Sequence, residues 1–242
     1  MSCGYHYDFP TMPYTTVMSV GGSIVVPDSV DTGFVTEFVG RMRSRLEKNP
    51  SWRLAIVVGG GATARRYQSA ARDMCPGCST DTLDTIGVAA TRVNAQVMRA
   101  AMADLCRDPV ITNPTEPGPI TGRVVVAGGW KPGFSTDNVA VRLAESLGAD
   151  TVINLSNIKQ IFTADPKVDP NASPLTHVSW REFFAIAGDE WVPGKNTPFD
   201  PIASRRAASL SMRVVAADGR DLDNLDAILD GESFVGTTVG PE

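Results

Sequence analysis

Residues 128–148 read Gly-Gly-Trp-Lys-Pro-Gly-Phe-Ser-Thr-Asp-Asn-Val-Ala-Val-Arg-Leu-Ala-Glu-Ser-Leu-Gly. The apolar run at 124–127, directly before this stretch, predicts a buried strand. A Gly/Pro loop follows at 128–133. Ser135 or Thr136 can then cap a helix, and Gly148 can end it. The stretch therefore predicts a strand, a glycine-rich loop and a helix in succession.

The start of this helix is a candidate anion site, because the backbone N–H groups of such a loop and of the first helical turn point to one place. Asp137 lies in that first turn, where its charge favours the helix dipole but repels an anion. An aspartate beside a phosphate usually implies a cation, either Mg²⁺ or a lysine. A capped helix after an ordinary loop explains the same residues, so this stretch alone leaves both interpretations open.

The composition indicates one large α/β domain or two small ones, since the chain has 242 residues and is 43% hydrophobic and 20% charged. The net charge is −5 and the sequence pI is about 5.1. With no long Lys/Arg run, the sequence argues against nucleic acid as the main partner. An anionic substrate would need a local basic pocket. No apolar run approaches the roughly 18 residues of a membrane span, and residues 1–14 lack the features of a signal peptide, so we expect a cytoplasmic protein with no membrane partner.

The four cysteines include one close pair, Cys75-Pro-Gly-Cys78, whose spacing suits a metal site or a redox pair. A structural zinc site needs four ligands. The sequence has no second Cys-x-x-Cys, and its two histidines are distant. We therefore favour a Pro-Gly turn that carries two thiols, and we predict no metal-ligating side chains.

Predicted strands that alternate with predicted helices along the chain indicate a mostly parallel sheet covered by helices on both faces. Residues 1–14 are expected to form an irregular arm before a single domain at 15–242. The predicted strands are 15–20, 54–58, 109–112, 124–127, 151–155, 212–217 and an edge strand at 235–239. The predicted helices are 31–47, one from about Thr63, 84–106, 136–147, 179–187, 200–209 and 222–229.

Glycine or serine follows four of these strands, at Gly21, Gly59, Gly128 and Ser156. Ligands of parallel sheets bind beyond the carboxyl ends of the strands, so we expect the four loops to converge on one crevice. Arg65 would lie in the first turn of the helix after Gly59, where a guanidinium can hold a phosphate, although a solvated surface arginine is the alternative. The polar residues Thr91, Arg92 and Asn94 are either satisfied core groups or a ligand-facing edge.

Taken together, these motifs resemble the amino acid kinase superfamily, specifically its archaeal-type UMP kinases, over residues 16–238. The fold implied is a three-layer α/β sandwich. The motifs that carry the resemblance are Gly21-Gly22-Ser23, Gly59-Gly60-Gly61 with Ala64-Arg65, Asp84-x-x-Gly87, Thr91-Arg92-x-Asn94-Ala95, Pro132-Gly133 with Ser135-Thr136-Asp137, Thr163-Ala164-Asp165-Pro166-Lys167, Asp200-Pro201-x-Ala203 and Gly236-Thr237-Thr238.

The resemblance implies where the two substrates bind. The acceptor UMP would lie on the part of the chain up to about residue 150, and ATP with Mg²⁺ on the part after it. Asp137 would organise the phosphoryl centre, with Arg65 as its second catalytic residue. Family members form hexamers, so a homo-oligomer is implied. The implied UMP ligands are Gly60, Gly61, Arg65, Asp84, Gly87 and Thr136, and the implied ATP ligands are Gly21, Gly22, Ser23, Phe162, Asp165 and Lys167.

The sequence departs from the family pattern at several positions near these sites. Ser19 stands where many members have a lysine, and Ala62 also replaces a common lysine. The nucleotide loop 157–162 carries Lys159, Gln160 and Phe162 in place of an acidic residue, a glycine and a tyrosine. Phe134 replaces a common histidine, and Arg205 replaces a lysine.

Two hypotheses follow for the function. In the first, the chain is a UMP kinase, and its acceptor is already an anionic phosphate that needs alignment and charge neutralisation more than a strong base. In the second, it is a non-kinase relative on the same fold, either a nucleotide-binding regulator or a molybdate or tungstate storage protein. The altered loop 157–162 favours the second hypothesis, while Arg65, Asp84 and Asp137 favour the first.

Overall fold

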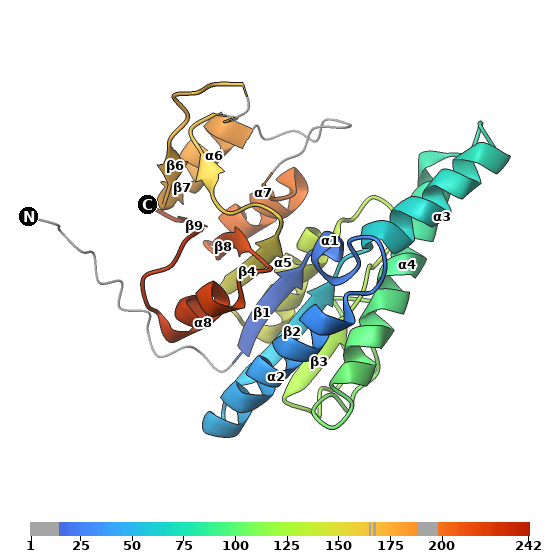
Figure 1. The fold of residues 1–242 in the computed structure, drawn as a ribbon, viewed down its shortest axis with the longest axis horizontal. Coiled ribbons are helices and arrows are strands. Elements are labelled where there is room, and N and C mark those ends of the chain that lie inside the picture. Colours follow the sequence, from blue (N-terminus) through green and yellow to red (C-terminus); the bar gives the residue numbers. More distant parts are fainter. Residues whose placement is uncertain (1–14, 165, 167, 188–197) are drawn as a thin grey trace, which may run out of the picture.

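The sheet at the centre of the molecule has seven strands in the order β3-β2-β1-β4-β8-β9-β7 (Figure 1). The structure is a computed structural model that describes residues 15–164, 166, 168–187 and 198–242. Two further strands, β5 (Ile161–Phe162) and β6 (Pro174–Leu175), pair as a small antiparallel ribbon. The strands of the main sheet are β1 (Thr15–Val20), β2 (Arg53–Val58), β3 (Val124–Ala127), β4 (Thr151–Ser156), β7 (His177–Ser179), β8 (Arg213–Asp218) and β9 (Thr237–Gly240).

Helices connect these strands, and side chains cap several of them as the sequence indicates. The Ser135 hydroxyl accepts a 3.1 Å hydrogen bond from the Asn138 amide, and Gly148 ends the same helix with a φ of 68°. Asp200 caps another helix by accepting from the Ala203 amide at 2.7 Å. The helices are α1 (Gly22–Val25), α2 (Thr32–Lys48), α3 (Gly61–Met74), α4 (Thr80–Ala101), α5 (Thr136–Leu147), α6 (Trp180–Ala187), α7 (Pro201–Ser209) and α8 (Leu222–Asp230).

Strands β1, β2, β3, β4 and β8 send alternate side chains into two separate hydrophobic cores. Met18 and its register partner Ile56 face the core shared with α2, α4 and α8. Their neighbours Val17 and Ala55 face the core shared with α5, α6 and α7. All four side chains are fully buried, and burying a large aliphatic side chain contributes about 1.5–3 kcal/mol. The predicted three-layer α/β sandwich is therefore confirmed.

Some predicted boundaries differ from the structure. Helix α4 begins at Thr80 rather than at residue 84, because the Ser79 hydroxyl accepts a 3.2 Å hydrogen bond from the Thr82 amide and caps it. It ends at Ala101, short of the predicted residue 106. The predicted strand 109–112 contributes only an isolated bridge between Ile111 and Ala127.

The strand predicted at 235–239 is present as β9, but its predicted place at the edge of the sheet is wrong. Strand β9 lies inside the sheet, antiparallel to β8 and parallel to β7. Strand β7 takes the edge, and its three residues carry no alternating pattern that the sequence could have revealed. Residues 1–14 and most of the loop at 188–199 lie outside the described residues.

The strand order places the predicted site at the carboxyl ends of the parallel strands. Strands β3, β2, β1 and β4 are adjacent and parallel, so the loops that follow them begin at the same edge (Figure 1). The Gly21 amide donates to the Leu155 carbonyl at 2.8 Å, and the Gly59 amide donates to the Val20 carbonyl at 3.0 Å. Within the described ranges, no helix is long and apolar enough to cross a bilayer.

Candidate active site

Two glycine loops, one after β1 and one after β2, cross in direct backbone contact at the carboxyl ends of these strands. A methyl group on Gly22 would collide with the backbone nitrogens of Gly60 and Gly61, and one on Gly59 would collide with the Gly22 nitrogen. Gly61 also has a φ of 55°, a left-handed conformation that side chains other than glycine rarely adopt. The backbones of the loop after β1 and the loop after β2 are therefore so close that no side chain fits between them.

Asn94 of α4 fixes the second of these loops. Its amide nitrogen donates to the carbonyls of Gly59 and Gly60, each at 2.9 Å. Its carbonyl oxygen accepts from the Thr63 hydroxyl at 3.1 Å, and the side chain is only 2% exposed. Among the first N–H groups of α3, which have no partner inside the helix, that of Ala62 donates to the Val26 carbonyl at 2.9 Å. Asn94 was absent from the predicted site, although the sequence motif contains it.

Asp137 lies between the end of β1 and the start of α7. Its carboxylate accepts a 3.0 Å hydrogen bond from the Ser19 hydroxyl and a 3.3 Å hydrogen bond from the Asp200 amide. Burial raises the pKa of Asp137 to about 6, the charge of Asp200 adds to this rise, and the two hydrogen bonds oppose it. Ser19, which stands where a lysine was expected, thus supplies a neutral donor instead of a positive charge.

Helix α4 also holds the loop at 128–135. The Thr91 hydroxyl accepts from the Gly129 amide at 2.6 Å. Arg92 donates to the carbonyl of Gly129 at 3.0 Å and to that of Trp130 at 2.7 Å. Both polar side chains inside α4 are therefore satisfied groups that position a loop.

Asp84 joins the same arrangement, because its carboxylate accepts a 3.0 Å hydrogen bond from the Gly133 amide. This contact brings Asp84 beside the loop that leads to Thr136. Gly87, one turn later, faces α3, and a methyl group there would come within 2.7 Å of the side-chain nitrogen of Gln68, which can move aside. The roles of Asp84, Gly87 and Thr136 toward a nucleotide stay predictions.

Two aromatic rings and two cations gather on this loop and on α5. The rings of Trp130 and Phe134 are 4.8 Å apart. The Lys131 ammonium lies 4.0 Å from the centre of the Trp130 ring, and the Arg142 guanidinium lies 5.4 Å from it. The sequence analysis expected a local basic pocket without naming these residues, and they place two positive charges beside this loop.

Arg65 differs from its expected position. Because α3 begins at Gly61, two residues before the predicted start, Arg65 lies beyond the first turn. Its exposed guanidinium donates to the Pro27 carbonyl at 3.1 Å. The neighbouring Arg66 pairs with Asp28. Arg65 thus contacts the segment that follows α1, and its role toward a phosphate stays a prediction.

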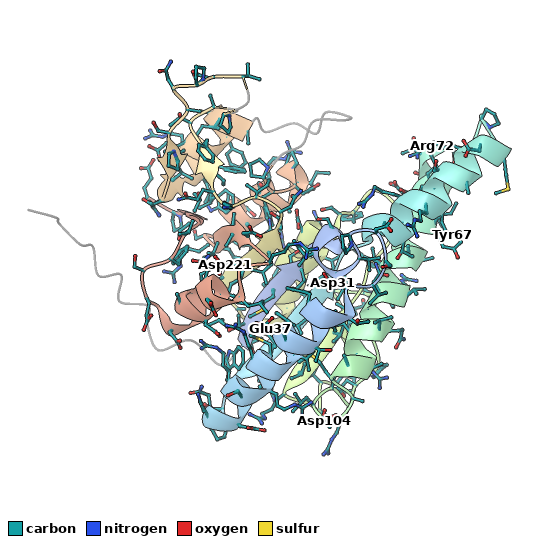
Figure 2. The ribbon with its side chains drawn as sticks, in the orientation of Figure 1. Asp31, Glu37, Tyr67, Arg72, Asp104 and Asp221 are labelled. Carbon is teal, nitrogen blue, oxygen red and sulfur yellow. The ribbon has the colours of Figure 1, made fainter. Side chains whose placement is uncertain are left out.

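Arg220 also contacts the segment that follows β1. It donates to the Ser23 and Ile24 carbonyls, each at 3.4 Å, and to the Asp31 carboxylate at 3.2 Å. Figure 2 labels Asp31 where α2 begins beside α1. Nothing in the sequence near Arg220 signalled this contact, because it joins segments almost two hundred residues apart.

The altered loop at 157–162 is anchored to the end of the chain. The Gln160 amide donates to the Gly236 carbonyl at 3.2 Å, and the Ile161 amide donates to the Thr237 hydroxyl at 2.9 Å. This hydroxyl also donates to the Leu175 carbonyl. The unusual Gln160 therefore contributes a structural contact. Phe162 follows directly in β5, whereas Asp165 and Lys167 lie outside the described residues.

The sequence of the chain is similar to that of known kinases. The model of the amino acid kinase family matches residues 15–217. A uridylate kinase from Methanospirillum hungatei is 37% identical over 228 residues, which cover 93% of this chain and 94% of the relative. A uridylate kinase from Pyrococcus abyssi is 33% identical over 229 residues, covering 93% and 99% of the two chains.

Solved structures give the same result. The crystal structure of the uridylate kinase from Archaeoglobus fulgidus matches with a TM-score of 0.78 at 32% identity, and the match covers 93% of this chain and 99% of that one. The UMP kinase from Bacillus anthracis matches with a TM-score of 0.75 at 18% identity, which supports the fold alone.

Proposed function

Because this chain belongs to the amino acid kinase family and, within it, to the uridylate kinases, we propose that it transfers the γ-phosphoryl group of ATP to UMP, giving ADP and UDP. The observation that carries the proposal is the glycine crossing, with the loop after β1 against the loop after β2. Two phosphate groups held by these two loops would meet at one point.

We assign the acceptor to the part of the chain up to about residue 150. Gly60, Gly61 and Arg65 would bind the UMP phosphate, and Asp84, Gly87 and Thr136 would contact the rest of the nucleotide. Two observations support this assignment. Asn94 holds the Gly59 and Gly60 carbonyls of the second glycine loop. The hydrogen bond from the Gly133 amide to Asp84 holds the loop that leads to Thr136 beside α4.

We assign ATP to the other side of the crossing. Gly21, Gly22 and Ser23 would carry its phosphates, and Phe162, Asp165 and Lys167 its base. A side chain at Gly22 would collide with the backbone of Gly60 and Gly61, so glycine at this position lets the two loops meet. Arg220 would keep this loop in place through its contacts with the Ser23 and Ile24 carbonyls.

The carboxyl side chains suit Mg²⁺ carried by ATP, because this ion is usually held by one or two carboxylates together with substrate phosphates. Asp137 is the carboxylate that would hold it, with Asp200 beside it. When bound, Mg²⁺ neutralises charge on the transferring phosphoryl group.

The transfer itself needs no strong general base. An oxygen of the UMP phosphate attacks the γ-phosphorus of ATP, and the bond from that phosphorus to the β–γ bridging oxygen breaks, leaving ADP. The backbone amides of the two loops and Arg65 would align the phosphates. Asp137, held by Ser19 and the Asp200 amide, would orient the centre in its ionised form.

The test is an assay of ADP release with Mg-ATP and purified protein, using UMP, CMP or no acceptor. Release that depends on UMP is expected. Thermal shift measurements with UMP and with molybdate complete the test, because a ligand that binds only the folded state raises its stability. Folded protein that is stabilised by molybdate and shows no turnover with UMP would favour the storage relative instead.

The proposal also covers the setting of the enzyme. We place it in the cytoplasm, in pyrimidine nucleotide biosynthesis, as a homo-oligomer of the hexameric kind that the family forms. Size-exclusion chromatography with light scattering tests the assembly directly, and a monomer at working concentration would remove that part of the proposal.

A further inference from the structure

The turn between α3 and α4 carries two thiols that the proposed reaction does not use. These helices form a hairpin that projects from the body of the molecule, and the turn lies at its outer end (Figure 1). Figure 2 shows Tyr67 and Arg72 along α3 on the way to this end. Cys75 and Cys78 stand on either side of Pro76-Gly77 in the turn.

The backbone brings the two cysteines within reach of each other. The Cys78 amide donates a 2.9 Å hydrogen bond to the Cys75 carbonyl, which closes a β-turn. The first and last Cα atoms of a β-turn are less than about 7 Å apart. A disulfide needs Cα atoms about 4.4–6.8 Å apart. The turn therefore presents the pair near disulfide spacing before any bond forms.

Both ends of the turn are held by the helices. The Cys75 amide donates to the Ala71 carbonyl at 2.9 Å and so completes the last turn of α3. Directly after Cys78, Ser79 caps α4 through the Thr82 amide. Proline suits the second position of such a turn because its φ is already fixed. The thiols are thus held close by structure on both sides, and little rearrangement is needed to join them.

The two thiols differ in access. Cys75 is exposed, Cys78 is partly buried, and both are free thiols. The third described cysteine, Cys106, is buried, and burial raises its pKa, which keeps its thiol protonated and unreactive. A small reagent from solution therefore meets Cys75 first.

A metal site is the less favoured use of this pair. A structural zinc site takes four ligands. Among residues 15–164, 166, 168–187 and 198–242, no third metal-ligating side chain joins the two cysteines. We therefore consider thiol–disulfide exchange, which needs only the two sulfur atoms of the pair and a disulfide reagent.

We propose that Cys75 and Cys78 form a reversible thiol–disulfide site that reacts with low-molecular-weight disulfides. The Cys75 thiolate attacks one sulfur of the reagent, the reagent's S–S bond breaks, and one thiol leaves. The Cys78 thiolate then attacks the Cys75 sulfur of this mixed disulfide and releases the second thiol. Two protein thiols are oxidised, the reagent is reduced to two thiols, and each departing thiolate takes up a proton.

The bond would join the end of one acceptor-side helix to the start of the other. Helix α3 carries Arg65, and α4 carries Asp84 and Asn94. Oxidation therefore restrains fraying at the outer end of the hairpin, about ten residues or 15 Å along α3 from Arg65. Slower amide hydrogen exchange at residues 71–82 is the expected physical sign.

The experiment uses the full chain with Cys3→Ser, treated with glutathione disulfide and examined by intact mass spectrometry and thiol counting. This Cys3→Ser chain, the parent of the variants below, is expected to lose two thiols on treatment without gaining a glutathione adduct. Dithiothreitol should restore both thiols. In Cys78→Ser, Cys75 should keep one glutathione per chain. In Cys75→Ser, labelling should be at least about tenfold slower, because the remaining thiol is partly buried. Cys106 serves as the internal control.

Several results would overturn the proposal. These are stable glutathione on both cysteines of the parent, disulfide-linked dimers in place of the internal bond, or no reaction where the chain unfolded in urea reacts. Equal rates for the two serine variants would remove the assignment of Cys75 as the attacking thiol. Tight binding of zinc by the reduced pair would favour a metal site. None of these readouts depends on kinase activity, so the proposal can fail while the proposed function stands.

Discussion

The Ser19 hydroxyl donates a 3.0 Å hydrogen bond to the Asp137 carboxylate, joining the first strand to a residue of α5 that lies 118 positions later. A neutral donor thereby occupies the place of the lysine that many family members carry. A hydroxyl stabilises a carboxylate less than an ammonium does, because it brings no net charge. This pairing is in keeping with a pKa of about 6 for Asp137.

Replacing Asp137 by asparagine should reduce turnover by about 10²–10³-fold, the usual cost of one group that stabilises charge at a reacting centre. Asparagine keeps the shape of the side chain and loses only its charge. ADP release at saturating Mg-ATP and UMP measures the effect. Turnover like that of the parent would exclude Asp137 from the centre.

The same variant gives a stability prediction. Because burial raises the pKa of Asp137 to about 6, the folded chain binds this proton more tightly than the unfolded chain does. The stability of the parent should therefore fall as the pH rises from about 4 to about 6. Asparagine has no proton to lose, so Asp137→Asn should be more stable at pH 7 by about 1–3 kcal/mol, and this gain should vanish below about pH 4. Urea unfolding of both proteins between about pH 4 and pH 7 measures this difference in stability. A gain in stability that does not change with pH would contradict the prediction.

Ser19→Ala should shift the acidic limb of the pH–rate profile to higher pH. The Ser19 hydrogen bond lowers the pKa of Asp137, so its loss allows that pKa to rise. One neutral hydrogen bond is worth about 0.5–1.5 kcal/mol, which corresponds to a shift of at most about one pH unit. Ser204→Ala is the matched control, since this buried hydroxyl donates to the Asp200 carbonyl instead. Equal profiles for the two variants would count against the role of Ser19.

Arg65→Ala should weaken UMP binding by about 10–100-fold and leave ATP binding nearly unchanged, because a charge-assisted hydrogen bond is worth about 1.5–3 kcal/mol. Calorimetry with each nucleotide measures both affinities. Arg66→Ala is the control, since Arg66 is the next residue on the same helix and pairs with Asp28. An equal loss for UMP and ATP would undo the proposed division of the crevice.

Asn94→Ala should cost about 2–4 kcal/mol of stability and weaken UMP binding, because it leaves the Gly59 and Gly60 carbonyls without their donor. Thr63→Ala removes only the hydrogen bond to the Asn94 carbonyl and should cost about 0.5–1.5 kcal/mol. Urea unfolding and UMP titration of both variants test the difference. Asn94→Ala with unchanged UMP affinity would show that the loop keeps its shape unaided.

Local features of this molecule could be predicted from the sequence. Ser135, Gly148 and Asp200 act within a few residues of their own position, and each marks a helix end as expected. The buried strands were equally plain, because a parallel strand covered on both faces reads as a continuous apolar run.

Features that depend on distant pairing could not be predicted. Asn94 reads as a polar residue on an apolar helix until Gly59 is placed against it, 35 positions away. The same holds for Arg220 and Ser23, and for the contact of Gln160 with the residue before β9. Short strands such as β7 depend on the hydrogen bonds of a neighbouring strand, so no alternating hydrophobic pattern in their own sequence predicts them.

Gly22 and Gly61 restrict the mutational routes open to this fold. Each occupies the space that a side chain on the other would need, so neither loop can acquire a side chain there while the other stays unchanged. A descendant with a different acceptor would keep both glycines and vary the residues around them. Trp130, Lys131 and Phe134 stand on a neighbouring loop free of this constraint, so evolutionary divergence in substrate choice should accumulate there.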